Sequence, residues 1–136
     1  MTRILVTGGD GFLGSNVVRL LLEKGCKVTV LVHPDSDSPN LEGLTLEIRK
    51  GDICDFQAVR QAMADCDAVI HAAAMTDIWP ARNDRLCRVN IEGTRNVIEA
   101  TLEAGIPRMI FVGSASSIKE VMYGGQPDFG LDYIES

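Results

Sequence analysis

The stretch TGGDGFLG, residues 7–14, follows the apolar run ILV and opens an amphipathic helical pattern. A buried strand, a glycine-rich turn and a helix N-terminus in this order suit a pyrophosphate, because the helix end offers unpaired N–H groups and a partial positive charge. We expect Gly8 to allow the tight exit from the strand, Gly11 the close approach of a ligand, and Gly14 close packing of the helix. A flexible turn without a ligand is the alternative, but the flanking strand and helix favour dinucleotide binding.

Length and composition limit the class of protein. The chain has 136 residues, enough for one domain, and is 46% hydrophobic with only 5% aromatic residues, which is typical of an aliphatic parallel sheet. A net charge of −6 without a basic block disfavours nucleic acid and anionic membranes as partners. The four cysteines lack metal-ligand spacing, so we expect no metal site and reduced thiols in a cytoplasmic protein. We also expect no membrane span and no signal peptide.

Strand-like and helix-like segments alternate along the chain. We expect strands at residues 3–7, 27–33, 45–49, 67–72 and 108–113, and helices at residues 12–24, 55–64 and 83–104. This alternation predicts an α/β fold, a doubly wound parallel Rossmann sheet with right-handed crossovers and strand order 3-2-1-4-5. Ligands of such sheets lie beyond the carboxyl ends of the strands, where strands one and four diverge.

The end of the second strand bears on the choice of cofactor. An acidic residue there would bind the ribose hydroxyls and select NAD, whereas a cation would favour the 2′-phosphate of NADP. The chain has Val32, which accepts no hydrogen bond, then His33, which is a cation when protonated, and only later Asp35. We therefore predict NADP as the preferred cofactor and NAD, held through Asp35, as the alternative. His33 could also be a solvated loop residue.

The segment after the third strand contains Asp52 and Ile53. The carboxylate can accept a hydrogen bond from the adenine amino group while Ile53 packs on the ring. Alternatively, Asp52 shapes a turn or caps the helix that starts near Asp55.

The fourth and fifth strands end in His71, followed by three alanines, and in Ser114. The alanines leave room for a flat ligand, or else permit tight packing of the sheet on a helix. We expect His71 to be a hydrogen-bonded core histidine rather than a catalyst or metal ligand. The only other histidine is His33, so a zinc site has little support. Ser114 could orient a substrate oxygen or simply mark a polar exit from the strand. No Gly-x-Ser-x-Gly sequence supports a hydrolase nucleophile.

Taken together, these motifs resemble the extended short-chain dehydrogenase/reductases, in particular the NAD-dependent epimerase/dehydratases of the dihydroflavonol-4-reductase-like branch. The matching pieces are TGGDGFLG, GDI at 51–53, HAAA at 71–74, VNIEGT at 89–94 and the strand that ends at Ser114. The resemblance implies that residues 1–118 form an NAD(P)-binding Rossmann domain. Residues 119–136 would be a loose C-terminal segment leading to a missing substrate domain.

The resemblance also implies roles for individual positions. It assigns contacts with the cofactor, or support of the cofactor site, to Gly8, Gly11, Phe12, Leu13, Gly14, His33, Asp52, Ile53, Ala72, Ala73, Ala74 and Asn90. Phe12 and Leu13 would supply N–H groups to the pyrophosphate, and Asn90 would support the active site. Ser114 would be the catalytic-set serine that binds the substrate. His33 stands where reductases of this branch often have arginine.

Catalysis in this family needs a Tyr-x-x-x-Lys motif, in which the lysine binds the ribose and lowers the pKa of the tyrosine, the general acid/base. Tyr123 is followed by Pro127, and the position four residues beyond Tyr133 lies past Ser136, so the chain has no such motif. Whether the chain is an enzyme therefore stays open.

Three functions remain under consideration. We expect the cofactor-binding part of an oxidoreductase or epimerase that transfers hydride to or from an alcohol or carbonyl substrate, sugar-nucleotide or dihydroflavonol/steroid-like, and that is inactive as this chain alone. The alternatives are a non-catalytic dinucleotide-binding or sensing module and binding of another adenine-containing ligand. An apolar sheet edge at the fifth strand further predicts a homo-oligomer or limited solubility.

Overall fold

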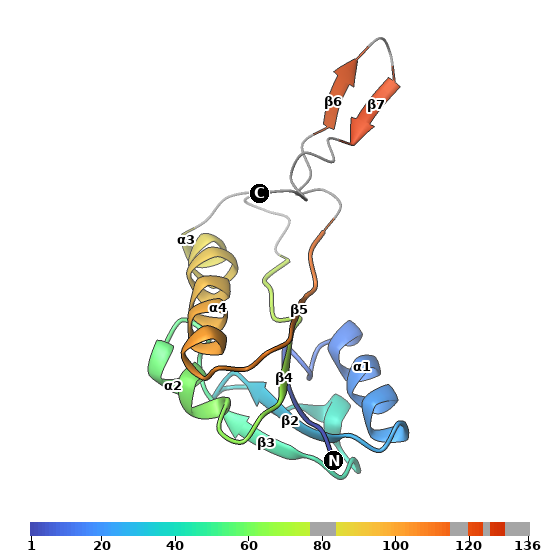
Figure 1. The fold of residues 1–136 in the computed structure, drawn as a ribbon, viewed down its shortest axis with the longest axis vertical. Coiled ribbons are helices and arrows are strands. Elements are labelled where there is room, and N and C mark those ends of the chain that lie inside the picture. Colours follow the sequence, from blue (N-terminus) through green and yellow to red (C-terminus); the bar gives the residue numbers. More distant parts are fainter. Residues whose placement is uncertain (77–83, 115–119, 124–125, 130–136) are drawn as a thin grey trace.

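The computed structural model describes residues 1–76, 84–114, 120–123 and 126–129. Its centre is a five-stranded parallel sheet in the order β3-β2-β1-β4-β5, which confirms the predicted topology (Figure 1). The strands are β1 (Arg3–Thr7), β2 (Lys27–Val32), β3 (Glu47–Lys50), β4 (Ala68–His71) and β5 (Met109–Phe111). Each lies within two residues of its predicted bounds.

Helices connect β1 to β2, β3 to β4 and β4 to β5, whereas the connection from β2 to β3 contains only a 3-10 turn. The helices are α1 (Phe12–Glu23), α2 (Phe56–Ala62), α3 (Asp84–Cys87) and α4 (Thr94–Glu103), with a π-helical turn (Arg88–Gly93) between the last two and a 3-10 turn at Pro39–Leu41. The predicted helix 83–104 is thus helical from Asp84 to Glu103 but contains one wider turn. None of the helices in the described ranges is long and apolar enough to cross a membrane.

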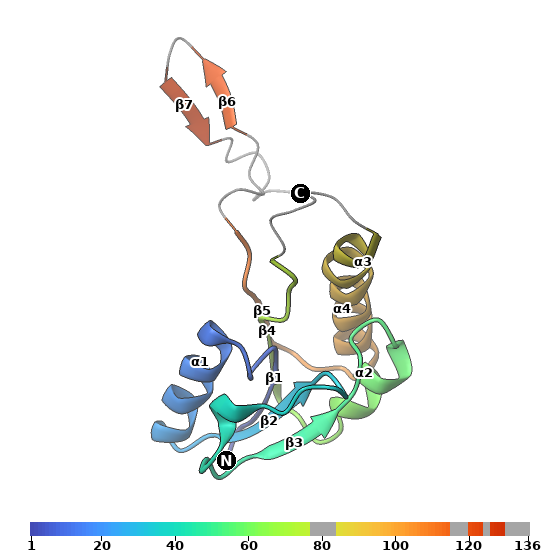
Figure 2. The ribbon, with the colours of Figure 1, turned by 180° about the vertical axis from the view of Figure 1, so that it is seen from behind.

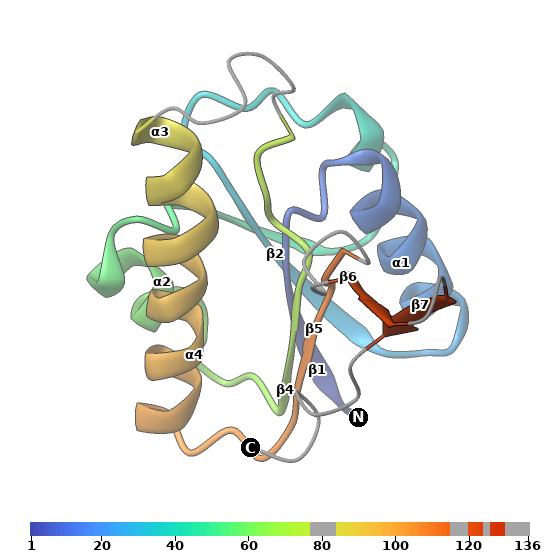
Figure 3. The same cartoon turned by 90° about the horizontal axis from the view of Figure 1, so that it is seen from above.

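The helices cover both faces of the sheet. Figure 3 shows α1 on one side of the strands and α2, α3 and α4 on the other. Alternate residues of β1 serve the two faces, because side chains along a strand point in opposite directions. Val6 packs with Val18 of α1, whereas Leu5 packs in a second cluster with Val59 of α2 and Val97 of α4. All five side chains are fully buried, which accounts for the aliphatic composition of the chain.

A two-stranded antiparallel hairpin, β6 (Glu120–Tyr123) and β7 (Gln126–Phe129), forms a sheet of its own (Figures 1 and 2). Residues 119–136 are predicted to be a loose segment, because glycine and proline recur in them. Residues 121–123 (VMY), however, favour a strand. Residues 119, 124–125 and 130–136 of this segment, including Tyr133, lie outside the described residues.

Candidate dinucleotide-binding pocket

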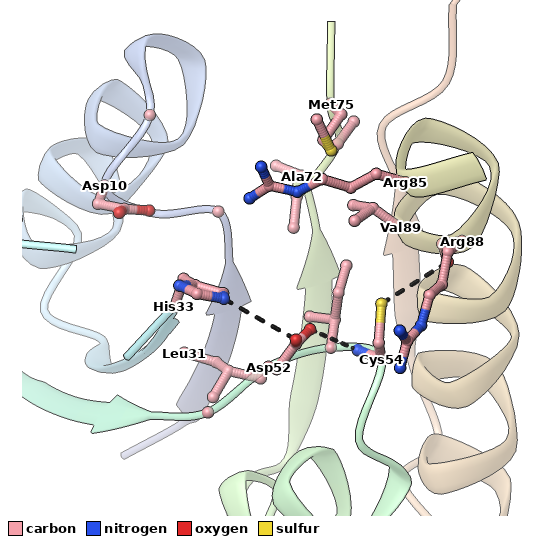
Figure 4. Close-up of a pocket in the computed structure, with 16 residues that line it drawn as sticks. Asp10, Leu31, His33, Asp52, Cys54, Ala72, Met75, Arg85, Arg88 and Val89 are labelled. Carbon is pink, nitrogen blue, oxygen red and sulfur yellow. Dashed lines mark hydrogen bonds and ion pairs between the residues drawn. The ribbon is translucent and has the colours of Figure 1, made fainter. Parts of the chain in front are cut away.

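A pocket of about 510 Å³ lies beyond the carboxyl ends of β1, β2, β3 and β4 (Figure 4). This volume falls within the range of roughly 300–1,000 Å³ that is typical of small-molecule sites. The pocket spans the point where β2 and β4 leave β1 in opposite directions, which is where ligands of such sheets bind. The predicted positions that line it are Gly8, Gly11, His33, Asp52, Ile53, Ala72, Ala73 and Ala74.

The glycine-rich turn brings β1, β4 and α1 into backbone contact. Gly8 has a φ of +69°, and a β-carbon there would lie 2.6 Å from the backbone nitrogen of Ala73. A β-carbon on Gly14 would overlap the carbonyl oxygen of Gly8. Neither position can hold a side chain without movement of the backbone. Because these positions have no side chains, the backbone of the turn itself forms part of the pocket wall.

The N-terminus of α1 lies beside this turn, and no acidic side chain of the helix itself occupies it. Its N-cap residue, Gly11, makes no side-chain capping hydrogen bond, and the first turn has no acidic residue. Helix geometry leaves the first N–H groups without intrahelical partners and gives this end a partial positive charge. The side chains of Phe12 and Leu13 are 89% and 51% exposed and do not line the pocket. Only their backbone groups could serve the predicted role.

His33 lies between two carboxylates at the end of β2. Its Nδ1 accepts a hydrogen bond from the backbone N–H of Asp35 at 3.3 Å. Nε2 therefore carries the proton when the ring is neutral, and it lies 3.8 Å from Oδ2 of Asp52 (Figure 4). The histidine side chain is 48% exposed. The edge that donates hydrogen bonds is thus directed along the pocket wall toward Asp52.

Asp52 both shapes a turn and lines the pocket. Its Oδ1 accepts a hydrogen bond from the backbone N–H of Cys54 at 2.8 Å. The N-cap of α2 is instead Asp55, whose carboxylate accepts hydrogen bonds from the N–H groups of Gln57 and Ala58.

Burial and the nearby Asp52 carboxylate raise the pKa of the Cys54 thiol. The thiol therefore stays protonated at neutral pH, and it donates to the carbonyl of Arg88.

His71 is the core histidine that the sequence predicted. It is fully buried, with Nδ1 2.6 Å from Oγ1 of Thr7 and Nε2 2.9 Å from Oγ1 of Thr94. Burial lowers the pKa of His71 to about 4. The ring is therefore neutral and links β1, β4 and the start of α4 below the pocket.

The structure separates the other two predicted positions from the pocket lining. Asn90, on the π-helical turn, hydrogen-bonds the backbone of Met75, which itself lines the pocket. Ser114 follows β5, is exposed and does not line the pocket. Of the two tyrosines, Tyr133 lies outside the described residues and Tyr123 is described by its backbone alone.

Several lining residues were not predicted as site residues. They are Asp10, Leu31, Gly51, Cys54, Met75, Arg85, Arg88 and Val89. Gly51 and Met75 lie in the stretches after β3 and β4 that the strand-end rule indicates, although neither was given an individual role in the site. The two arginines gave no such signal, because a charged residue in a helical pattern looks the same on an open surface as beside a pocket.

The strand order, the uncapped helix end and the close glycine turn define a domain of the Rossmann type. The chain belongs to the NAD dependent epimerase/dehydratase family, which it matches over residues 4–129. The family resemblance of the sequence is thereby confirmed, and a dinucleotide is the family's cofactor.

Individual relatives show how much of a longer protein the chain represents. It is 37% identical over 130 residues to a 3-beta-hydroxysteroid dehydrogenase from Mycolicibacterium neoaurum, covering 91% of this chain and 34% of the relative. It is 40% identical over 114 residues to a 2-alkyl-3-oxoalkanoate reductase from Stenotrophomonas maltophilia, covering 84% and 34%. The chain thus spans about a third of the length of these curated relatives.

A solved structure with a bound cofactor has the same fold. The UDP-glucose 4-epimerase of Thermus thermophilus, in complex with NAD, superposes with a TM-score of 0.78 at 28% identity. The match covers 92% of this chain and 42% of the epimerase.

Proposed function

We propose that this chain is the NAD(P)-binding part of an oxidoreductase or epimerase that works by hydride transfer. The observation that carries the proposal is the contact geometry of Gly8 and Gly14, which places an uncapped helix end beside the pocket. That geometry suits a diphosphate, because backbone N–H groups and the helix dipole favour an anion there.

The remaining pocket residues fit the rest of a dinucleotide. Ile53 offers an apolar surface for the adenine ring, and Asp52 a carboxylate for its amino group. Backbone and small side chains at residues 72–74 border the path toward the nicotinamide ribose. Asn90 fixes the backbone of Met75 at the far end of that path.

In the longer protein, the bound nicotinamide would exchange a hydride at C4 with an alcohol or carbonyl carbon. Ser114 would orient the substrate oxygen. Because the chain has no Tyr-x-x-x-Lys, we expect it to catalyse no turnover alone. The relatives favour a hydroxysteroid-like, ketone or sugar-nucleotide substrate, since their names specify such compounds.

The decisive measurement is calorimetric titration of the full chain with NADPH and NADH. Gly8→Ala should abolish binding, because its β-carbon would meet Ala73. Gly25→Ala is the matched control. Gly25 also has a positive φ, +78°, but an added β-carbon would meet nothing within 4 Å. Absence of binding by the unsubstituted chain, with its circular dichroism intact, would refute the proposal.

We also propose that the chain prefers NADP. The partly exposed His33, whose Nε2–H edge lines the pocket, supports this preference, because it could donate to a 2′-phosphate. NADPH should bind at least about threefold more tightly than NADH, and His33→Arg should widen the difference. Equal affinities, or tighter binding of NADH, would contradict the preference and favour ribose recognition by a carboxylate.

A non-catalytic dinucleotide sensor is the second candidate, and the missing Tyr-x-x-x-Lys is the observation that favours it. An in-frame Tyr-x-x-x-Lys shortly downstream in the gene would favour the enzyme. Carbonyl-dependent NADPH oxidation by the purified chain would contradict the expected inactivity of this chain alone.

Copies of the chain are further proposed to associate in the cytoplasm. β5 is an edge strand, and its residues Ile110 and Phe111 are 52% and 59% exposed. Edge strands with apolar side chains favour pairing with another chain. The four free cysteines accord with a reducing compartment. A concentration-independent monomer in sedimentation would contradict the association.

A further inference from the structure

Arg85 is the charged residue of the pocket that has no partner of its own among the described residues. The side chains of the lining that could carry a positive charge are His33, Arg85 and Arg88. His33 lies between Asp35 and Asp52, and Arg88 has its Nε 3.8 Å from Oε2 of Glu92. Arg85 makes no hydrogen bond or ion pair with any described residue. Its guanidinium group is thus available for a ligand.

The side chain of Arg85 is directed across the pocket. Figure 4 shows it extending from α3 over Ala72, toward the side of the pocket where Asp10 lies. Arg88, one turn further along, lies instead beside Cys54. The two arginines therefore serve different ends of the pocket, although both come from the same helical stretch.

The opposite wall has the character that an arginine would complement. It consists of the glycine turn and the uncapped start of α1, which can bind one side of a diphosphate through backbone groups. The nearby Asp10 carboxylate already accepts a hydrogen bond from Ser36 Oγ at 2.5 Å. A diphosphate on this wall would leave its outer oxygens facing the pocket mouth. A guanidinium group suits those oxygens, because it can donate two parallel hydrogen bonds.

We propose that Arg85 binds the diphosphate bridge of the dinucleotide from the side opposite the glycine turn. This inference deepens the proposed function and rests on it. Arg85 is a binding residue for the cofactor and takes no part in hydride transfer. The diphosphate would then lie between the glycine turn and Arg85, which are far apart in the sequence.

The test compares Arg85→Gln with the unsubstituted full chain in titrations with NAD, ADP and adenosine. Charge-assisted hydrogen bonds at a partly exposed site suggest that NAD and ADP will bind roughly five- to tenfold more weakly to the variant. Adenosine, which has no phosphate, should bind equally to both. Arg85→Lys should lose less affinity than Arg85→Gln, because it keeps the charge but not the planar fork.

Arg95→Gln is the matched control, because Arg95 is also exposed on this helical stretch but does not line the pocket. It should leave all three affinities unchanged. Suppose that the unsubstituted chain binds NAD, and that the Arg85→Gln variant binds NAD and ADP as tightly as the unsubstituted chain does. The inference is then overturned while the proposed function stands. An equal loss for adenosine would also overturn it, since the effect would not depend on phosphate. If the unsubstituted chain binds no dinucleotide, both proposals fail.

Discussion

Asn90 holds the backbone of Met75 at both of its polar groups. Its Oδ1 accepts from the Met75 N–H at 2.8 Å, and its Nδ2 donates to the Met75 carbonyl at 3.0 Å. This pair of bonds attaches the segment after β4 to the π-helical turn. The pocket lining at Met75 is therefore positioned by a residue that does not line the pocket itself.

Replacement of Asn90 should loosen this wall. Asn90→Ala removes both bonds and should lower the free energy of unfolding by about 1–3 kcal/mol, as is usual when backbone partners are lost. Dinucleotide affinity should fall as well. Asn90→Asp keeps the acceptor alone and should lie between the two proteins in urea denaturation. Asn16→Ala, which removes an exposed bond to Phe12, serves as control. Equal stability of Asn90→Ala and Asn16→Ala would contradict the expectation.

Gly14 should resist substitution despite its place in a helix. Alanine normally stabilises an exposed helix interior by about 1 kcal/mol relative to glycine. Here the new β-carbon would collide with the carbonyl oxygen of Gly8. We expect Gly14→Ala to be about 1–3 kcal/mol less stable, as in overpacked cores. A rise in the midpoint of thermal unfolding would show instead that the turn can move.

The stability of the chain should fall on acidification because of His71. Burial holds its folded pKa at about 4, below the ordinary 6.5. The unfolded chain therefore takes up a proton first, and stability declines from about pH 6.5 down to about pH 4, then levels off. The His71 contribution is about 3 kcal/mol at most. His71→Gln, which can still bond both threonines, should lose this part of the pH dependence.

Nuclear magnetic resonance would observe the same group directly. The ring signals of His71 should remain those of a neutral imidazole at pH 5. Titration of His71 with a midpoint near 6.5 would contradict both the burial and the predicted decline in stability.

Substitutions of Asp52 and Asp55 should have different effects, the first on dinucleotide affinity and the second on the stability of the fold. Asp55→Ala removes the N-cap of α2 and should cost about 1 kcal/mol of stability with little change in dinucleotide affinity. Asp52→Ala removes a carboxylate from the pocket and should weaken binding several-fold. Paired calorimetry and urea denaturation would measure both effects. The same loss of affinity in the two variants would mean that Asp52 acts only through the local fold.

The elements that the sequence predicted well are those with a local physical signal. Apolar runs located the strands, and the glycines after α1 and α4 located the ends of those helices. The alternation of strands and helices then predicted the sheet order. Gly25 and Gly105 do have positive φ values, +78° and +65°, just past the two helices. The π-helical turn carried no such signal, because its residues keep an ordinary helical pattern.

The pocket was predictable where a strand end supplied the residues and not where a helix did. Asp52 and Ile53 come two and three residues after the end of β3, so the strand-end rule located them. Arg85 lies in a helical stretch, and its place in the pocket lining depends on how the chain after β4 brings α3 back over the carboxyl end of the sheet. No residue pattern within a single element encodes that placement.

The position of Ile53 depends on contacts with Gly93 and Asn96, which lie about forty residues further along the chain. A β-carbon on Gly93 would lie 2.6 Å from Cδ1 of Ile53, and Asn96 Nδ2 donates to the Ile53 carbonyl at 2.9 Å. A half-domain ending after β4 would keep the whole glycine turn yet lack the surface that Ile53 rests against. Grafts that transplant only the first four strands should therefore retain the phosphate end of the site and lose discrimination of the base.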